Sequence, residues 1–149
     1  MPSLEVAAFL ARKKAKGALD ILQKENQVVL TADSVVILND TIYGKPVDRK
    51  DAIRIIGELS GNKHTVVTGV CLKSLTKEVV FSGISHVYFA ELTPEEIEFY
   101  VDTYEPYDKA GSYAIQEWIG LCKISRIDGT YHNIMGLPVD LVYRELHNF

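Results

Sequence analysis

Three charged residues interrupt parts of this sequence that are otherwise apolar or rigid. Asp33 lies inside the apolar run from Val28 to Leu38. Lys14 falls on the apolar stripe of a predicted helix, and Lys45 stands between a glycine and a proline. Lysine ammonium groups neutralise phosphate oxygens, and carboxylates bind Mg²⁺ together with substrate phosphates. These residue types therefore favour a site for a polyphosphate and a divalent metal ion.

Asp33 is the most informative of the three because its surroundings are apolar. The run around it is short and rich in β-branched residues, which is typical of a buried strand. An ionised carboxylate in such a strand costs several kcal/mol unless it is paired, hydrogen-bonded or bound to a metal. Asp33 could ligate Mg²⁺ and deprotonate an attacking water. Alternatively, it caps a nearby loop or pairs with one lysine, and Lys14 in turn could simply extend its ammonium group to solvent.

The bulk properties indicate one globular domain over residues 1–149. Hydrophobic residues make up 47% and charged residues 24% of the chain, close to the globular average. The formal net charge of −4 argues against broad binding to nucleic acid. No apolar stretch reaches the roughly 18 uncharged residues that a membrane span requires. Cys71 and Cys122 form no metal or redox motif, and both are predicted to be buried, reduced thiols.

The order of helical and strand patterns predicts an α/β fold, with one mixed, twisted sheet flanked by helices. Ser3, Asp48 and Thr93 are predicted helix caps. Helices are expected over residues 4–22, 48–61, 93–103 and 139–146, and strands over residues 28–38, 41–43, 64–75, 78–89 and 121–127. The stretch 104–120 is the least regular and carries the loop 105–112. Walker A, GxGxxG, HExxH, GxSxG and zinc-ligand spacings are all missing, so the common nucleotide and hydrolase motifs do not apply.

A set of short motifs, in a fixed order along the chain, resembles the Maf family. The matching segments are Leu10-Ala11-Arg12-Lys13-Lys14-Ala15, Thr31-Ala32-Asp33-Ser34, Gly44-Lys45-Pro46, Leu59-Ser60-Gly61, Tyr107-Asp108-Lys109-Ala110-Gly111-Ser112-Tyr113, Ile115-Gln116 and Ile134-Met135-Gly136-Leu137-Pro138. Each motif alone is weak, but the ordered set is specific.

The resemblance implies a fold similar to that of the inosine triphosphate pyrophosphatases. It also implies hydrolysis of a nucleoside triphosphate to its monophosphate and diphosphate, with Mg²⁺ or Mn²⁺, as a house-cleaning activity. By this resemblance Asp33 is the proton acceptor and a metal ligand, and Lys14 and Lys45 bind phosphate. Ser34 and Gln116 are associated with base selection. A cytoplasmic location and a homodimer are implied as well.

The loop after the third predicted helix is similar to the family branch that acts on dTTP and UTP, rather than the branch that acts on 7-methyl-GTP. Its Asp108 and Lys109 are expected to contact substrate, or else to form an internal ion pair that shapes the loop. Gln116 could offer a donor and an acceptor to a pyrimidine edge, or could stabilise the loop. Ser34 could equally be a packing residue.

The start of the chain departs from the family pattern. Family members begin with a strand and an arginine-containing S-x-S-P-R-R loop, followed by an acidic segment, whereas this sequence begins with Met1 shortly before Lys14. The sequence therefore predicts either an N-terminally truncated Maf-like domain or a shortened relative with reduced activity. The alternative to a pyrophosphatase is a Maf-fold remnant that binds a nucleotide or a partner without efficient turnover.

Overall fold

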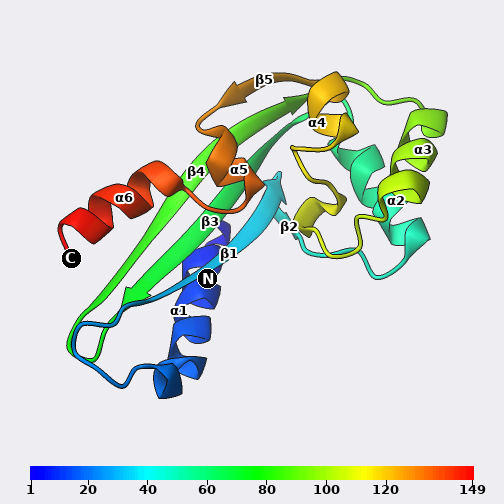
Figure 1. The fold of residues 1–149 in the computed structure, drawn as a ribbon. Helices are drawn as coiled ribbons and strands as arrows, with labels where there is room; N and C mark the ends of the chain where they lie inside the picture. Colours follow the sequence, from blue (N-terminus) through cyan, green and yellow to red (C-terminus); the bar gives the residue numbers. More distant parts are fainter.

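The apolar run around Asp33 forms a strand, as the sequence predicts, and this strand belongs to a single sheet. A computed structural model describes residues 1–149 (Figure 1). Its strands are β1 (Val29–Leu38), β2 (Thr41–Tyr43), β3 (Lys63–Lys73), β4 (Glu78–Phe89) and β5 (Ile124–Asp128). They lie in the order β2-β1-β3-β4-β5, and each neighbouring pair is antiparallel.

The predicted class is confirmed, because one α/β domain contains a single sheet flanked by helices. The expectation of a mixed sheet is wrong. Asn39 and Asp40 make a tight turn with positive φ between β1 and β2, and four residues join β3 to β4. Such short connections allow only antiparallel neighbours in these two pairs, because a parallel pair needs a long crossover. The pairs β1–β3 and β4–β5 are joined by longer segments and are antiparallel as well.

Helices occupy most of the predicted positions. They are α1 (Val6–Gly17), α2 (Arg49–Leu59), α3 (Pro94–Tyr104), α4 (Trp118–Lys123), α5 (Tyr131–Met135) and α6 (Val139–His147). Single 3-10 turns occur at Ser3–Glu5, Leu19–Ile21 and Ala110–Ser112, labelled η1, η2 and η3. None of these helices is both long enough and apolar enough to cross a membrane.

The predicted caps hold at two of three helices. The Asp48 carboxylate accepts from the N–H of Asp51, and Thr93 makes a reciprocal capping box with Glu96. Ser3 does not cap α1. Instead its hydroxyl donates to Asp40 in the β1–β2 turn, 3.0 Å away, because the 3-10 turn η1 separates it from the start of α1.

The segment 118–135 contains the main differences from the expected elements. The predicted strand 121–127 begins only at Ile124, because α4 takes up its first residues, and α5 is not anticipated. Cys122 therefore lies on α4 and is exposed, in contrast to the buried thiol expected there, whereas Cys71 is buried in β3.

Small residues bring α1 close to one face of the sheet. Ala7, Ala11 and Ala15 recur every four residues and are at most 1% exposed. Opposite them, a Cβ on Gly69 of β3 would lie 2.3 Å from the backbone of Ala7, so only glycine permits this approach. The helix therefore lies directly behind β1 and β3 (Figure 1).

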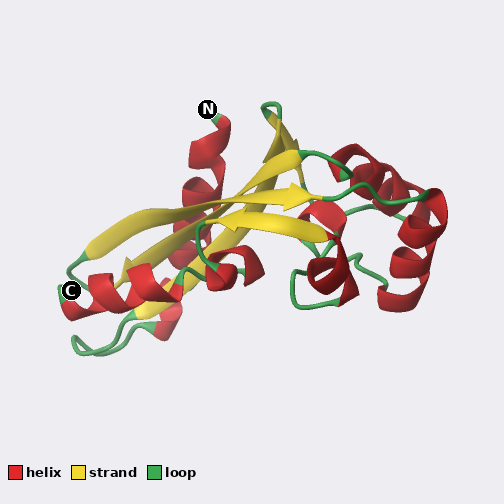
Figure 2. Ribbon diagram, turned by 90° about the horizontal axis from the view of Figure 1, so that it is seen from above, coloured by secondary structure: helices red, strands yellow, loops and turns green.

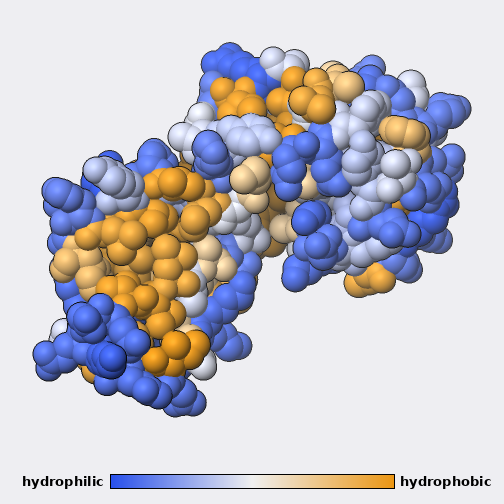
Figure 3. Space-filling model, viewed as in Figure 1, coloured by the Kyte–Doolittle hydropathy of each residue, from blue (hydrophilic) through white to orange (hydrophobic).

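The other face of the sheet carries the larger core. Val36, Val66 and Val87 pack there against side chains of α2, α3 and α4. Towards the opposite end of the sheet, Val70 and Leu72 pack against Val142 of α6. Figure 2 shows the resulting arrangement, with one group of helices beyond one end of the sheet and α6 alongside the other. Figure 3 shows apolar atoms gathered on the half of the molecule that carries α6.

Candidate functional site

One cavity of about 270 Å³ is lined by all seven residues that the sequence predicts for the site. They are Lys14, Asp33, Ser34, Lys45, Asp108, Lys109 and Gln116. Most of the other lining residues are apolar or aromatic: Ala32, Val36, Val66, Ala110, Tyr113, Ala114, Ile134 and Met135, together with Gly136. The tertiary structure therefore brings together positions that are spread over more than a hundred residues of sequence.

The cavity passes around a free edge of β1. Strand β2 pairs with β1 only from Val36 onwards, so the first part of β1 has a neighbour on one side only. Consecutive strand residues point to opposite faces of a sheet. Asp33 accordingly contacts α1, whereas Ser34 faces the side that carries α5. A cavity lined by both residues therefore combines the charged groups near α1 with the apolar surface on the other face.

Asp33 and Lys14 form an ion pair at the charged end of the cavity. Lys14 Nζ lies 3.1 Å from Asp33 Oδ2 and donates a hydrogen bond to the carbonyl oxygen of Ala32, also at 3.1 Å. The Asp33 side chain is 26% exposed, and its Oδ1 has no hydrogen-bond partner. Asp33 therefore pairs with one lysine, as one of the sequence interpretations expected, and still offers an oxygen to the cavity.

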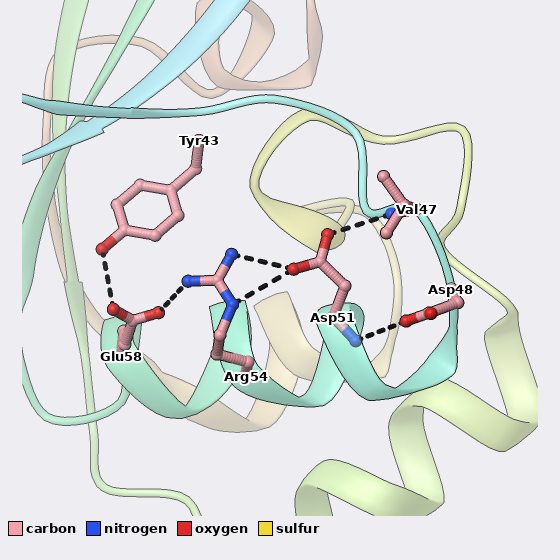
Figure 4. A network of polar contacts seen from close by, with 6 residues as sticks. All are labelled: Tyr43, Val47, Asp48, Asp51, Arg54 and Glu58. Carbon is pink, nitrogen blue, oxygen red and sulfur yellow. Dashed lines mark hydrogen bonds and ion pairs between the residues drawn. The ribbon is translucent and has the colours of Figure 1, made fainter.

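Lys45 reaches the cavity from a loop whose two ends are held by side chains of α2. At one end, Tyr43 donates to Glu58 Oε1 at 3.4 Å. At the other, the N–H of Val47 donates to Asp51 Oδ2 at 3.0 Å. Arg54 lies between the two carboxylates and pairs with both, so a single polar network connects the two ends of the loop (Figure 4). Lys45 itself is exposed and has no ion-pair partner.

The surroundings of each group in this network favour one protonation state for it. The N–H of Val47, followed by the guanidinium of Arg54, lowers the pKa of the Asp51 carboxyl below its ordinary value. Burial, with the nearby Glu58 carboxylate, raises the pKa of Tyr43. Tyr43 therefore remains a neutral hydrogen-bond donor and Asp51 a charged acceptor at neutral pH.

The loop with Asp108 and Lys109 closes another side of the cavity. The two side chains pair at 3.3 Å, although Asp108 remains 74% exposed. The loop can approach β1 because of Gly111, where a Cβ would lie 2.6 Å from Val36 Cγ2, and its N–H donates to the carbonyl of Gly44. The ion pair is thus present beside the cavity, and a ligand contact by either side chain stays a prediction.

Sequence reasoning missed a buried polar chain behind Ser34. The Ser34 hydroxyl oxygen lies 2.7 Å from that of Thr68, which in turn donates to the backbone carbonyl of Asn133 at 3.0 Å. Asn133 directly precedes Ile134, the first residue of a motif that matches the family. This position next to the motif was the one sequence feature that could have pointed to Asn133. Thr68 could not be found in this way, because its role depends on the register between β1 and β3.

The residues present suit a divalent ion that is held partly by substrate. No group of three or more His, Cys, Asp or Glu side chains is arranged to hold a metal ion. Mg²⁺ commonly uses one or two protein carboxylates together with substrate phosphates. Asp33, with one unpartnered oxygen at the charged end of the cavity, fits that donor pattern.

The cavity combines lysines and carboxylates with apolar side chains, which are the residue types expected around a phosphorylated ligand that also has an apolar part. Comparison with known proteins places the chain in a family. The family described as "Maf-like protein" matches residues 1–149, and the chain belongs to it.

Several similar proteins carry one shared name. The chain is 49% identical over 146 residues to a protein of Porphyromonas gingivalis named dTTP/UTP pyrophosphatase, covering 97% of this chain and 73% of that protein. Proteins of the same name from Parabacteroides distasonis and Flavobacterium psychrophilum are 44% and 43% identical, each over 99% of this chain. The alignments cover 76% and 75% of those two relatives.

Proposed function

We propose that this protein is a nucleoside triphosphate pyrophosphatase that hydrolyses dTTP and UTP to the monophosphate and diphosphate. The observation that carries the proposal is the Asp33–Lys14 pair beside Lys45 in one cavity. The names of relatives at 43–49% identity support the same activity and substrates.

In the proposed reaction, a water oxygen bonds to phosphorus and the bond between the α- and β-phosphates breaks, which releases diphosphate. Asp33 Oδ1 accepts the proton of the attacking water. Lys14 and Lys45 bind phosphate oxygens and balance the charge that develops on them. A divalent ion, Mg²⁺ or Mn²⁺, would be held by Asp33 and the phosphates, and would supply further charge neutralisation.

Replacement of Asp33 by asparagine tests this role. We expect Asp33→Asn to lower the rate of diphosphate release from dTTP by at least about 100-fold, since general base catalysis alone contributes on the order of 10²–10⁴. Asp140→Asn, which changes an exposed carboxylate on α6 outside the cavity, is the matched control and should keep full activity. Release of single phosphate, or an active Asp33→Asn protein, would contradict the proposal.

One observation favours a second function, nucleotide binding with little turnover. Two of the three lysines in the cavity already pair with carboxylates of the same cavity, and no arginine lines it. Lys45 is then the single unpaired cation available to a triphosphate. Calorimetry with dTTP and Mg²⁺, run beside the diphosphate assay, separates the two functions, because tight binding without release of diphosphate would support the second.

Three further properties implied by the family resemblance remain predictions. A homodimer would be seen as twice the chain mass of 16.7 kDa by light scattering. A cytoplasmic location would be seen by cell fractionation. Activity is expected to require Mg²⁺ or Mn²⁺, so that a chelator should stop diphosphate release and added metal should restore it.

A further inference from the structure

The hydrogen-bond chain behind Ser34 has only one consistent arrangement of protons. Thr68 Oγ1 lies between two oxygens, Ser34 Oγ at 2.7 Å and the Asn133 carbonyl oxygen at 3.0 Å. A carbonyl oxygen can only accept, and a hydroxyl has a single proton to donate. Thr68 must therefore donate to Asn133, which leaves Ser34 as the donor in the contact with Thr68. The reverse arrangement would place two oxygen lone pairs against each other and lose one hydrogen bond.

The far end of this chain is held firmly. Asn133 is 2% exposed, and its side-chain Nδ2 donates to Ser85 Oγ at 2.9 Å. Its backbone N–H donates to Thr130 Oγ1, which caps α5. The side chain lies directly against Gly83, where a Cβ would be 2.4 Å from Asn133 Oδ1. Since Thr68 is also fully buried, neither the carbonyl nor the threonine hydroxyl can exchange its partner for water.

The consequence concerns the side of Ser34 that faces the cavity. The only proton of the Ser34 hydroxyl is committed to Thr68, and Ser34 has no other hydrogen-bond partner within the protein. Its remaining lone pairs are free, and Ser34 lines the cavity together with the apolar side chains of Ile134 and Met135. A ligand in this part of the cavity therefore meets a hydroxyl that can accept a hydrogen bond but cannot donate one.

We propose that Thr68 and Asn133 are positioning residues that orient the Ser34 hydroxyl as an acceptor, so that Ser34 selects a base with a ring N–H. The proposal rests on the proposed function and refines its substrate class. Uracil and thymine present an N–H at ring position 3, whereas cytosine presents a lone pair at the same place. With cytosine, the Ser34 oxygen would face the N3 lone pair, and both acceptors would lack a hydrogen-bond donor. A site built to make this one hydrogen bond therefore discriminates strongly against the cytosine nucleotide.

The experiment compares UTP with CTP, which have the same size and the same triphosphate. We expect the wild-type ratio of kcat/KM for UTP over CTP to exceed about 10. Thr68→Val removes the hydroxyl and frees the Ser34 proton to turn towards the cavity, so the ratio should fall by about tenfold, partly through a gain with CTP. Thr68→Ser keeps the hydroxyl and should preserve the ratio.

Thr65→Val is the matched control. Thr65 lies on the same strand, is half-buried and has its hydroxyl bonded to His86, but it does not line the cavity. This variant should keep the wild-type ratio. A Thr68→Val protein with the same UTP preference as Thr65→Val would overturn the proposal.

If Thr68→Val does not fold, two other measurements still test the proposal, one on a Ser34 variant and one on the wild-type protein. Ser34→Ala should also lose the UTP preference, and N3-methyl-UTP, which lacks the ring N–H, should bind wild-type protein at least about tenfold more weakly than UTP. Equal binding of the methylated nucleotide would contradict the proposal. Failure of the proposed pyrophosphatase activity would be distinguishable, because the protein would then release no diphosphate from any nucleotide. In that case calorimetry would still show whether UTP binds more tightly than CTP.

Discussion

The three lysines of the cavity differ in what they already contact. Lys14 pairs with Asp33 and Lys109 pairs with Asp108, whereas Lys45 has no ion-pair partner. A nucleotide phosphate must compete with a carboxylate for the first two but not for the third. At the residue scale, Lys45 is therefore expected to be the largest single contributor to binding of the triphosphate.

Lys45→Met tests this expectation, because methionine keeps much of the side-chain length without the charge. A charge-assisted hydrogen bond contributes about 1.5–3 kcal/mol, so kcat/KM for dTTP should fall by about 10–100-fold. The change should appear mainly in KM if Lys45 binds ground state and transition state equally. Lys50→Met, at an exposed lysine of α2 outside the cavity, should have little effect; a similar loss in both proteins would refute a specific role for Lys45.

At the scale of elements, α2 positions the loop that carries Lys45. The helix supplies Asp51, Arg54 and Glu58, and these side chains hold Val47 and Tyr43 on either side of the loop (Figure 4). Isolated ion pairs at a protein surface contribute little to stability. The network is therefore expected to matter more for the placement of Lys45 than for the folding of the domain.

Asp51→Ala should raise the KM for dTTP several-fold while the protein stays folded at room temperature. Asp102→Ala is a suitable comparison, because Asp102 also pairs with an arginine, through two hydrogen bonds from Arg49, but has no contact with the loop. Circular dichroism would check folding, and steady-state kinetics would check KM. If Asp102→Ala raised KM as much as Asp51→Ala does, the network would not be what positions Lys45.

At the scale of the whole molecule, a buried histidine connects the core to the cavity. His64 is 1% exposed, and its Nε2 lies 2.6 Å from the hydroxyl of Tyr113, which lines the cavity. Its Nδ1 has no partner. Burial lowers the pKa of His64 to about 4, so the folded protein keeps this ring neutral across the physiological range.

The stability of the protein should consequently fall in mild acid. The unfolded chain begins to protonate His64 near pH 6.5, whereas the folded protein resists down to about pH 4. The unfolded state thus binds more protons in this interval, and the free energy of unfolding decreases as the pH falls, by up to about 3 kcal/mol. Well above pH 6.5 the ring is neutral in both the folded and the unfolded state, so His64 no longer makes the stability depend on pH there.

Urea unfolding between pH 7 and pH 4.5 measures this effect. His64→Gln should be less stable at pH 7 but should lose less stability on acidification than the wild type. His147→Gln, which changes an exposed histidine near the C-terminus, should follow the wild-type curve. Parallel curves for wild type and His64→Gln would show that the buried ring is not the source of the acid sensitivity.

The sequence was sufficient to predict the elements whose signals are local. The apolar run of β1, the Asp48 and Thr93 caps and the amphipathic α6 depend on residues close together in the chain, and they were assigned correctly to within a few residues. The start of the strand expected at 121–127 and the Ser3 cap were wrong, because α4 takes up residues 121–123 and the 3-10 turn η1 separates Ser3 from α1. The members of the candidate site came from ordered motifs, which name residues without saying how they meet.

Only the tertiary structure decided which groups contact one another. The pairing of Lys14 with Asp33 depends on how closely α1 approaches the sheet over Gly69. The direction of the Ser34 hydroxyl depends on the register that sets Ser34 opposite Thr68, and on α5 presenting the Asn133 carbonyl from across the fold. These contacts join residues distant in sequence, and their energies depend on distances of a few ångströms that no local pattern specifies.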